Sequence, residues 1–205
     1  MSALGHPTAP VRRAPSSRLP TPSQTAGPFV SLGTAWLADA STGSETDLSA
    51  IVVAGSVLDG DDRPVTDAML EFWQAGASGA SSVGSSQSWS GLARALSGPD
   101  GRYRLVTVKP PALPGPQRQL QAPHIDVSIF ARGLLQRLVT RIYFSDEEAN
   151  QADPVLAGLA SPDLRSRLVA QRSNADDPGS TNGPPAYLFD VHLQGGRETV
   201  FFGPR

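Results

Sequence analysis

Short runs of apolar residues, separated by turn residues, dominate the chain from about residue 50 onward. AIVVAGSVLDG (50–60) ends in the turn dipeptide Asp59-Gly60, and the run AMLEFWQA (68–75) follows it. RYRLVTVKP (102–110) comes directly after the turn sequence Pro99-Asp100-Gly101. Apolar runs of this length, bounded by Gly, Pro and Asp, are typical of β-strands. The first half of the patterned region therefore predicts at least three strands.

The second half repeats this pattern with clearer turns. HIDVSIFA (124–131) and QRLVTRIYF (136–144) predict two strands joined by a turn at Arg132-Gly133. YLFDVHLQ and RETVFF, on either side of Gly195-Gly196, predict a hairpin over 187–202. The stretch 161–172 starts with a Ser/Asp cap signal and predicts a short helix. Many short strands with few helices predict an all-β fold, an antiparallel β-sandwich.

Two segments lack this patterning. Residues 1–20 are rich in Pro, Ala and Ser, which predicts a flexible N-terminal arm in front of a single domain over 21–205. Residues 76–98 are dominated by Gly and Ser and are expected to form a long loop.

Composition restricts the possible functions. The 205 residues carry 17 basic and 19 acidic side chains, a formal net charge of −2, so nucleic acid is not an expected partner. Cysteine is absent, which excludes disulfides and thiolate metal sites and fits a reducing compartment. The first residues have no apolar segment typical of a secretory signal, and no apolar run has the length of a membrane helix. We expect a cytoplasmic protein without membrane association.

Candidate chemistry begins with His124 and Asp126. They lie two apart in a predicted strand, so both side chains leave the same face, about 7 Å apart along the strand. Such a pair resembles half of a metal site. The alternative is a neutral histidine in a strand, hydrogen-bonded to a neighbour such as Asp126. The three tyrosines, Tyr103, Tyr143 and Tyr187, all occupy strand positions where an aromatic ring packs across a sheet.

Four separated stretches resemble the protocatechuate 3,4-dioxygenases, a branch of the intradiol ring-cleavage dioxygenase family. They are TPSQTAGPF (21–29), VLDGDDRPVTDAMLEFWQA (57–75), APHIDVSIFARGLLQRLVTRIYF (122–144) and YLFDVHLQGGRETVFF (187–202). The first and third are the more specific. The resemblance implies a β-sandwich built from two homologous chain types, of which only the beta chain holds ferric iron, through two tyrosinates and two histidines.

This chain departs from the beta pattern at the iron ligands. Where the beta chain has His-x-His, this sequence has His124-x-Asp126, and neither the Pro-rich loop before that strand nor residues 75–101 contain a tyrosine. Phenolate ligands stabilise ferric iron, so their absence matters. The resemblance therefore implies the iron-free alpha subunit, paired with an iron-bearing beta subunit. The complex would cleave protocatechuate with dioxygen to 3-carboxy-cis,cis-muconate, while His124 and Asp126 mark a vacated metal site.

The resemblance also implies substrate-binding residues at the partner's active site. They are Thr25, Gly27, Pro28 and Phe29, where the family usually has Tyr in place of Phe29, and Arg132. An arginine can hold the carboxylate of protocatechuate through two hydrogen bonds. Arg132 can also be a solvated turn residue or part of an interchain ion pair, and the 25–29 segment can be an interface arm alone. Trp73 is expected in the core or at a chain boundary, and His192 at the surface or an interface.

Two other functions remain open at this stage. One is a self-sufficient intradiol dioxygenase that recruits Tyr103 or Tyr187 to a rearranged site with His124. The other is a non-catalytic β-sandwich module that binds a protein or an aromatic ligand.

Overall fold

The computed structural model describes residues 24, 25, 27, 49–75, 91–115, 119–173 and 183–203. The predicted arm over 1–20, Pro28, Phe29 and the Gly/Ser-rich part of the loop, 76–90, lie outside these residues. The strands are β1 (Ala50–Leu58), β2 (Met69–Trp73), β3 (Leu92–Leu96), β4 (Arg102–Val108), β5 (Leu113–Pro114), β6 (Leu120–Gln121), β7 (His124–Phe130), β8 (Leu138–Phe144), β9 (Val169–Arg172), β10 (Ala186–Leu188) and β11 (Val191–His192). The helices are η3 (Glu148–Ala152), α2 (Pro154–Ala157) and α3 (Pro162–Ser166).

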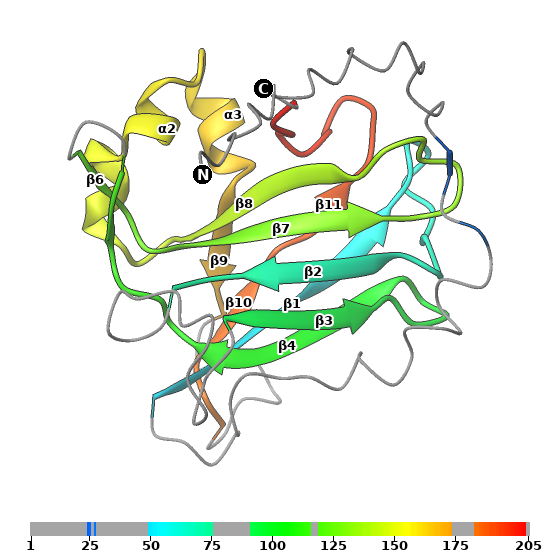
Figure 1. Cartoon of the computed structure of the whole chain (residues 1–205), viewed down its shortest axis with the longest axis horizontal. Coiled ribbons are helices and arrows are strands. Elements are labelled where there is room, and N and C mark those ends of the chain that lie inside the picture. The colour runs from blue at the N-terminus through cyan, green and yellow to red at the C-terminus, as the bar shows by residue number, and fades with distance from the viewer. Residues whose placement is uncertain are drawn as a thin grey trace, which may run out of the picture.

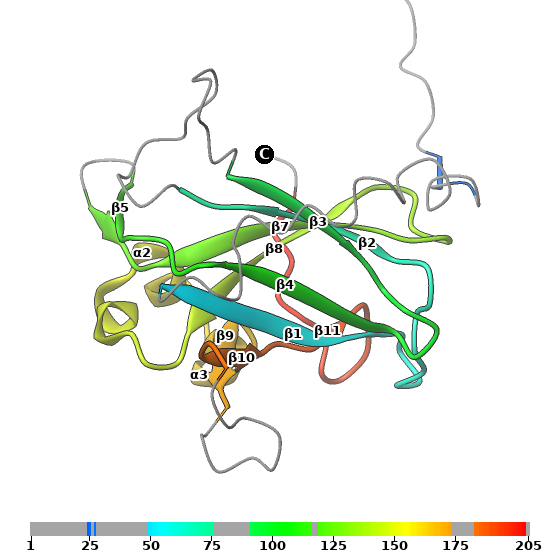
Figure 2. The ribbon, with the colours of Figure 1, turned by 90° about the horizontal axis from the view of Figure 1, so that it is seen from below.

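The strands form two facing layers, which confirms the all-β sandwich. One layer has β3, β2, β7 and β8 in that order, and the other contains β1 with β4, β10 and β11, as Figure 2 shows from below. β9 joins the layers because it pairs with β8 on one side and β10 on the other. The helical segment lies at one end of the sandwich, opposite the turn between β7 and β8 (Figure 1).

The sequence predicted an antiparallel sandwich, but three of the described strand pairs are parallel. β10 and β11 run parallel to β1, and β9 runs parallel to β8. Parallel pairing requires a long connection, and the chain provides one where η3, α2 and α3 follow β8.

The core lies between the layers and follows the two-residue alternation of the strands. Ile125, Val127 and Ile129 of β7 all point inward and are at most 1% exposed. They pack with inward residues of both layers, including Val53, Val57, Leu70, Phe72, Tyr103, Leu105, Ile142 and Phe144. Each fully buried side chain of this size contributes about 1.5–3 kcal/mol. A smaller cluster of Ala122, Tyr143, Leu156 and Leu168 attaches the helical segment to β8.

Three local predictions were wrong. Residues 92–96 form β3 rather than loop, with Ala93 and Ala95 buried against the core. The predicted helix begins as expected, where Ser161 caps α3 by accepting the N–H of Leu164, but it ends at Ser166, and 169–172 form β9. Over 187–202, β10 and β11 form, while 199–203 adopt no strand and the N–H of Phe202 donates to the carbonyl of Val139.

Among the described residues, no helix is long and apolar enough to cross a membrane.

Candidate functional site

His124 is held within the chain rather than presented to solvent. It is 5% exposed, its Nδ1 lies 2.7 Å from the carbonyl oxygen of Ala122, and its ring centroid lies 5.6 Å from that of Tyr143. Burial lowers the pKa of His124 below its ordinary value and outweighs the opposing contact with Ala122, so the neutral imidazole is favoured. The expected histidine hydrogen bond exists, but its partner is backbone and not Asp126.

Asp126 pairs instead with an arginine on the neighbouring strand. It stands opposite Arg141 of β8, whose Nε donates to its Oδ1 at 2.8 Å. The Nη1 of Arg141 also donates to Gln121 Oε1 at 3.1 Å and approaches the hydroxyl of Tyr143 at 3.5 Å. Burial lowers the pKa of Arg141, yet Asp126 and Tyr143 outweigh that effect and raise it overall. A permanent cation therefore stands beside the carboxylate that would otherwise attract a metal ion.

A second carboxylate, which is fully buried, forms hydrogen bonds with the residues around His124 and the helical segment. Asp153 is 0% exposed and accepts four hydrogen bonds: from the N–H groups of Ala122 (2.8 Å), Val155 (2.8 Å) and Leu156 (3.0 Å), and from the hydroxyl of Tyr143 (3.1 Å). It is also the N-cap of α2. Asp153 thus connects Ala122, which precedes β7, with Tyr143 near the end of β8 and with the start of α2. These bonds hold the residues that surround His124.

An open cleft of about 880 Å³ lies over the pair of Asp126 and Arg141. Its polar residues include Gln119 and Gln121, and its apolar wall comes from Val139, Pro154, Val155, Leu159, Phe201 and Phe202. Of the two residues expected to mark a vacated metal site, Asp126 lines this cleft and is paired with Arg141, whereas His124 is not among the lining residues.

The three tyrosines of the chain do not fit the ferric ligand set implied by the resemblance, and none of them is among the residues that line this cleft. The hydroxyl of Tyr103 donates to the carbonyl of Phe189 at 2.6 Å, and the hydroxyl of Tyr187 donates to Asp146 at 2.9 Å. Burial is the main cause that raises the pKa of Tyr103, Tyr143 and Tyr187 above the ordinary value. Ligation would require ionised phenols, which these surroundings oppose. Within the described residues, no three His, Asp or Glu side chains are grouped as a metal site.

A different edge of the molecule brings together three of the five predicted substrate-binding positions. The segment that contains Thr25 and Gly27 lies beside the turn between β7 and β8 (Figure 1), and the N–H of Gly133 donates to Thr25 Oγ1 at 2.7 Å. Gly133 has φ +88°, a conformation that glycine adopts without strain. Arg132 precedes it with 62% of its side chain exposed, and its Nε forms an ion pair with Asp67. Arg132 is therefore a paired turn residue within this chain.

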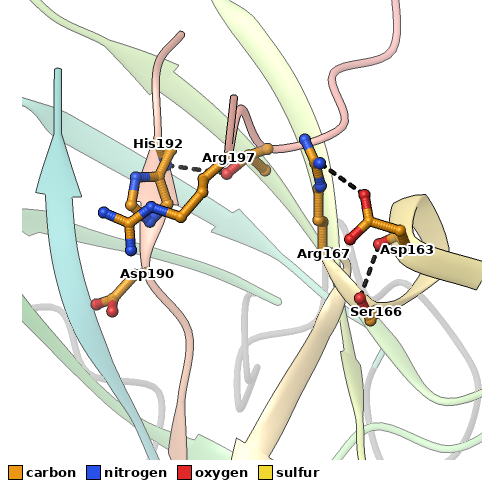
Figure 3. A pocket seen from close by; sticks show the side chains of 7 residues that line it. Asp163, Ser166, Arg167, Asp190, His192 and Arg197 are labelled. Atoms are coloured by element: carbon orange, nitrogen blue, oxygen red, sulfur yellow. Dashed lines mark hydrogen bonds and ion pairs between the residues drawn. The ribbon is translucent and has the colours of Figure 1, made fainter. Parts of the chain in front are cut away.

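The cavity in Figure 3, of about 270 Å³, gathers charged side chains between α3 and the C-terminal segment. Arg167 pairs with Asp163 at 2.6 Å, and Ser166 donates to the backbone oxygen of Asp163. His192, expected at the surface or an interface, is 9% exposed within this chain and lies 3.4 Å from Asp62. Because the serine and the histidine have separate partners, this arrangement is not a nucleophile–base pair.

Comparison with known proteins identifies the family. A family profile described as "Dioxygenase" matches residues 34–195. The protocatechuate 3,4-dioxygenase alpha chain of Pseudomonas putida is 37% identical over 197 residues, which cover 89% of this chain and 95% of that relative. This chain belongs to the intradiol ring-cleaving dioxygenase family. The alpha chain from Burkholderia cepacia is 38% identical over 199 residues, with 89% and 96% covered.

Other members of the intradiol family are more distant. The protocatechuate 3,4-dioxygenase beta chain of Burkholderia cepacia is 35% identical over 155 residues, which cover 71% of this chain and 64% of that one. Among solved structures, the dioxygenase domain of a carbohydrate-binding fusion protein from Streptomyces sp. SirexAA-E superposes with a TM-score of 0.58 at 25% identity, covering 76% of this chain and 87% of that domain.

Sequence reasoning missed three residues of the two sites. Arg141 has a detectable signal, because a hairpin turning at 131–136 places it opposite Asp126. Asp153 and Asp67 carry none, since each acts through partners that are distant in sequence. Trp73, expected in the core or at a chain boundary, is 46% exposed, so the core assignment was wrong.

Proposed function

We propose that this chain is the iron-free alpha subunit of a protocatechuate 3,4-dioxygenase. Its partner is a homologous beta subunit that holds Fe(III), and the complex cleaves protocatechuate between its two hydroxylated carbons. Both atoms of dioxygen enter the product, 3-carboxy-cis,cis-muconate. The identity to two alpha chains over nearly their whole length supports this assignment.

The observation that carries the proposal is the ion pair of Asp126 and Arg141. A metal site needs carboxylate and imidazole donors that are not already neutralised, and the 2.8 Å contact places a guanidinium on this carboxylate. The pair removes the electrostatic reason for a cation to bind here, so the ring-cleaving chemistry is assigned to the partner.

The contribution of this chain is to shape the partner's pocket. We assign substrate contacts to Thr25, Gly27, Pro28, Phe29 and Arg132. The bond between Gly133 and Thr25 supports this assignment, because it joins the N-terminal segment and the arginine turn into one surface. Arg132 supplies a cation for the substrate carboxylate, and Gly27 allows close approach of backbone to a ligand.

The test is a visible spectrum with iron quantitation and an oxygen-consumption assay, on the lone chain and on the chain co-expressed with its beta partner. We expect a colourless, iron-free, inactive lone chain and a coloured, active complex. A lone chain with stoichiometric iron and a tyrosinate absorption band would overturn the proposal in favour of a self-sufficient enzyme. A complex that contains iron and forms no product from protocatechuate would contradict the assigned reaction.

A further inference from the structure

The turn that carries Asp67 is unusually well fixed for an exposed connection between strands. Ser97 is 6% exposed, and its Oγ donates to the carbonyl of Val65 at 2.7 Å while accepting the N–H of Ala68 at 2.8 Å. The N–H of Ser97 also donates to the carbonyl of Ala68 at 2.9 Å. These three bonds attach both sides of Asp67 to the end of β3 and restrict its backbone.

Asp67 holds Arg132 by one edge of its guanidinium group. Its side chain is only 22% exposed, and its Oδ2 accepts from the Nε of Arg132. A guanidinium has two edges that can meet a carboxylate, one formed by Nε and a terminal nitrogen and the other by the two terminal nitrogens. The contact with Asp67 uses the first edge. In the part of the chain that the structure describes, the two terminal nitrogens of Arg132 form no hydrogen bond or ion pair, and 62% of this side chain is exposed.

We propose that Asp67 is the positioning residue that makes Arg132 selective for a carboxylate. By holding Nε, it fixes the plane of the guanidinium and leaves the two terminal nitrogens facing outward, where they receive an aromatic carboxylate in two parallel hydrogen bonds. This inference rests on the proposed function, in which Arg132 meets the substrate carboxylate.

Asp67 has two opposing effects on the affinity of Arg132 for a carboxylate ligand. Fixing the guanidinium beforehand removes the entropy cost of ordering a long, exposed side chain when the ligand binds. The negative charge of Asp67, however, weakens the attraction of Arg132 for a second carboxylate. Because the site faces solvent, where charge–charge attraction is screened, we infer that orientation outweighs the loss of attraction.

The experiment uses the assembled complex with its iron-bearing partner and two inhibitors of ring cleavage, 4-hydroxybenzoate and its neutral isostere 4-hydroxybenzamide. We expect Asp67→Ala to raise the inhibition constant of the acid by about 3- to 10-fold, the value of one positioned hydrogen bond, with no change for the amide. Asp67→Asn keeps an oxygen acceptor for Nε and should stay within about twofold of the wild type. If the alanine variant fails to assemble, Asp67→Leu takes its place, because leucine is similar in size to aspartate and cannot accept from Nε. It should raise the inhibition constant of the acid by the same factor, about 3- to 10-fold, and an unchanged constant would overturn the inference.

A double-mutant cycle separates this inference from the proposed function. Arg132→Ala should raise the inhibition constant of the acid and leave that of the amide unchanged. Adding Asp67→Ala to that variant should change neither constant further. If Arg132→Ala leaves both inhibitors unaffected, the proposed role of Arg132 fails. If Arg132→Ala acts and Asp67→Ala does not, only the inference about Asp67 fails.

Other results would also overturn the inference. Tighter binding of the acid by Asp67→Ala would mean that Asp67 competes with the ligand for Arg132. Equal weakening of both inhibitors would indicate a general structural effect. Asp61→Ala is the matched control, because Asp61 pairs with Arg63 at 3.5 Å in another exposed turn, and it should alter neither inhibition constant.

Discussion

Asp153 should be among the most sensitive positions for stability, although it touches no proposed ligand. Replacing it by alanine removes the acceptor of four hydrogen bonds, three of which come from buried groups of Ala122, Leu156 and Tyr143. Each buried donor left without a partner costs about 1–3 kcal/mol. Because such costs are not additive and the chain can relax, we expect Asp153→Ala to lower the free energy of unfolding by about 3–5 kcal/mol.

Urea denaturation followed by circular dichroism measures this loss, with amide hydrogen exchange at Ala122 as a local readout. Asp153→Asn keeps the shape and one acceptor oxygen, so its loss should be smaller, about 1–3 kcal/mol. The matched control is Asp163→Ala in the first turn of α3, where the carboxylate is 68% exposed and a loss of at most about 1 kcal/mol is expected. A loss below about 1 kcal/mol for Asp153→Ala would refute the role assigned to this carboxylate.

Three further perturbations test other parts of the structure. Lys109→Met removes a partly buried ammonium that lies 2.8 Å from Asp146, pairs with Glu147 and lies 5.1 Å from the centroid of Phe144. Glu147 loses this cation, while Asp146 keeps the hydroxyl of Tyr187 at 2.9 Å and Arg172 at 3.5 Å. The variant should lower the free energy of unfolding by about 1–3 kcal/mol in urea denaturation, and an unchanged midpoint would contradict this. Burial holds the pKa of His124 below 6.5, so its contribution to stability is complete above that pH and declines as the pH falls below it. His124→Gln should therefore flatten the dependence of the melting temperature on pH below 6.5, whereas parallel curves would be evidence against a buried neutral imidazole. In Gly133→Ala the added Cβ would meet no atom within 4 Å, but the alanine would have to adopt φ +88°. Thermal denaturation should therefore show a loss of about 1 kcal/mol in the free energy of unfolding. A neutral or stabilising effect would be inconsistent with this turn geometry.

The strands were predictable because their information is local. Alternation of apolar residues in β7, and the Gly133 turn that joins it to β8, are properties of consecutive residues, and both appear in the structure as expected. The turn around Asp59 also forms, with its Oδ1 accepting the N–H groups of Asp61 and Arg63. Because local chemistry already favours these conformations, tertiary contacts had only to select among them.

The assignments that failed depended on partners remote in sequence. Val169 and Ala170 extend a pattern compatible with a helix, yet they pair with Tyr143 and Phe144 of β8, and burial at that strand outweighs helix propensity. β3 has two alanines with little intrinsic preference for a strand, and its pairing with β2 decides its conformation. Residues 199–203 continue a convincing hairpin pattern, but contacts with β8 replace the second strand.

The same division applies to the functional residues. The β-sandwich follows from short patterns of apolar and turn residues in the sequence. The family, the replacement of an expected histidine by Asp126 and the candidate Arg132 follow from the resemblance of four stretches to known dioxygenases. Three contacts are evident only in the folded chain: Arg141 neutralises Asp126, Asp153 accepts from the N–H of Ala122, and Asp67 pairs with Arg132. These contacts join residues that are 15, 31 and 65 positions apart. Hydrogen bonds and ion pairs act over a few ångströms in space, so they exist only once the packing of the two layers has brought their partners together.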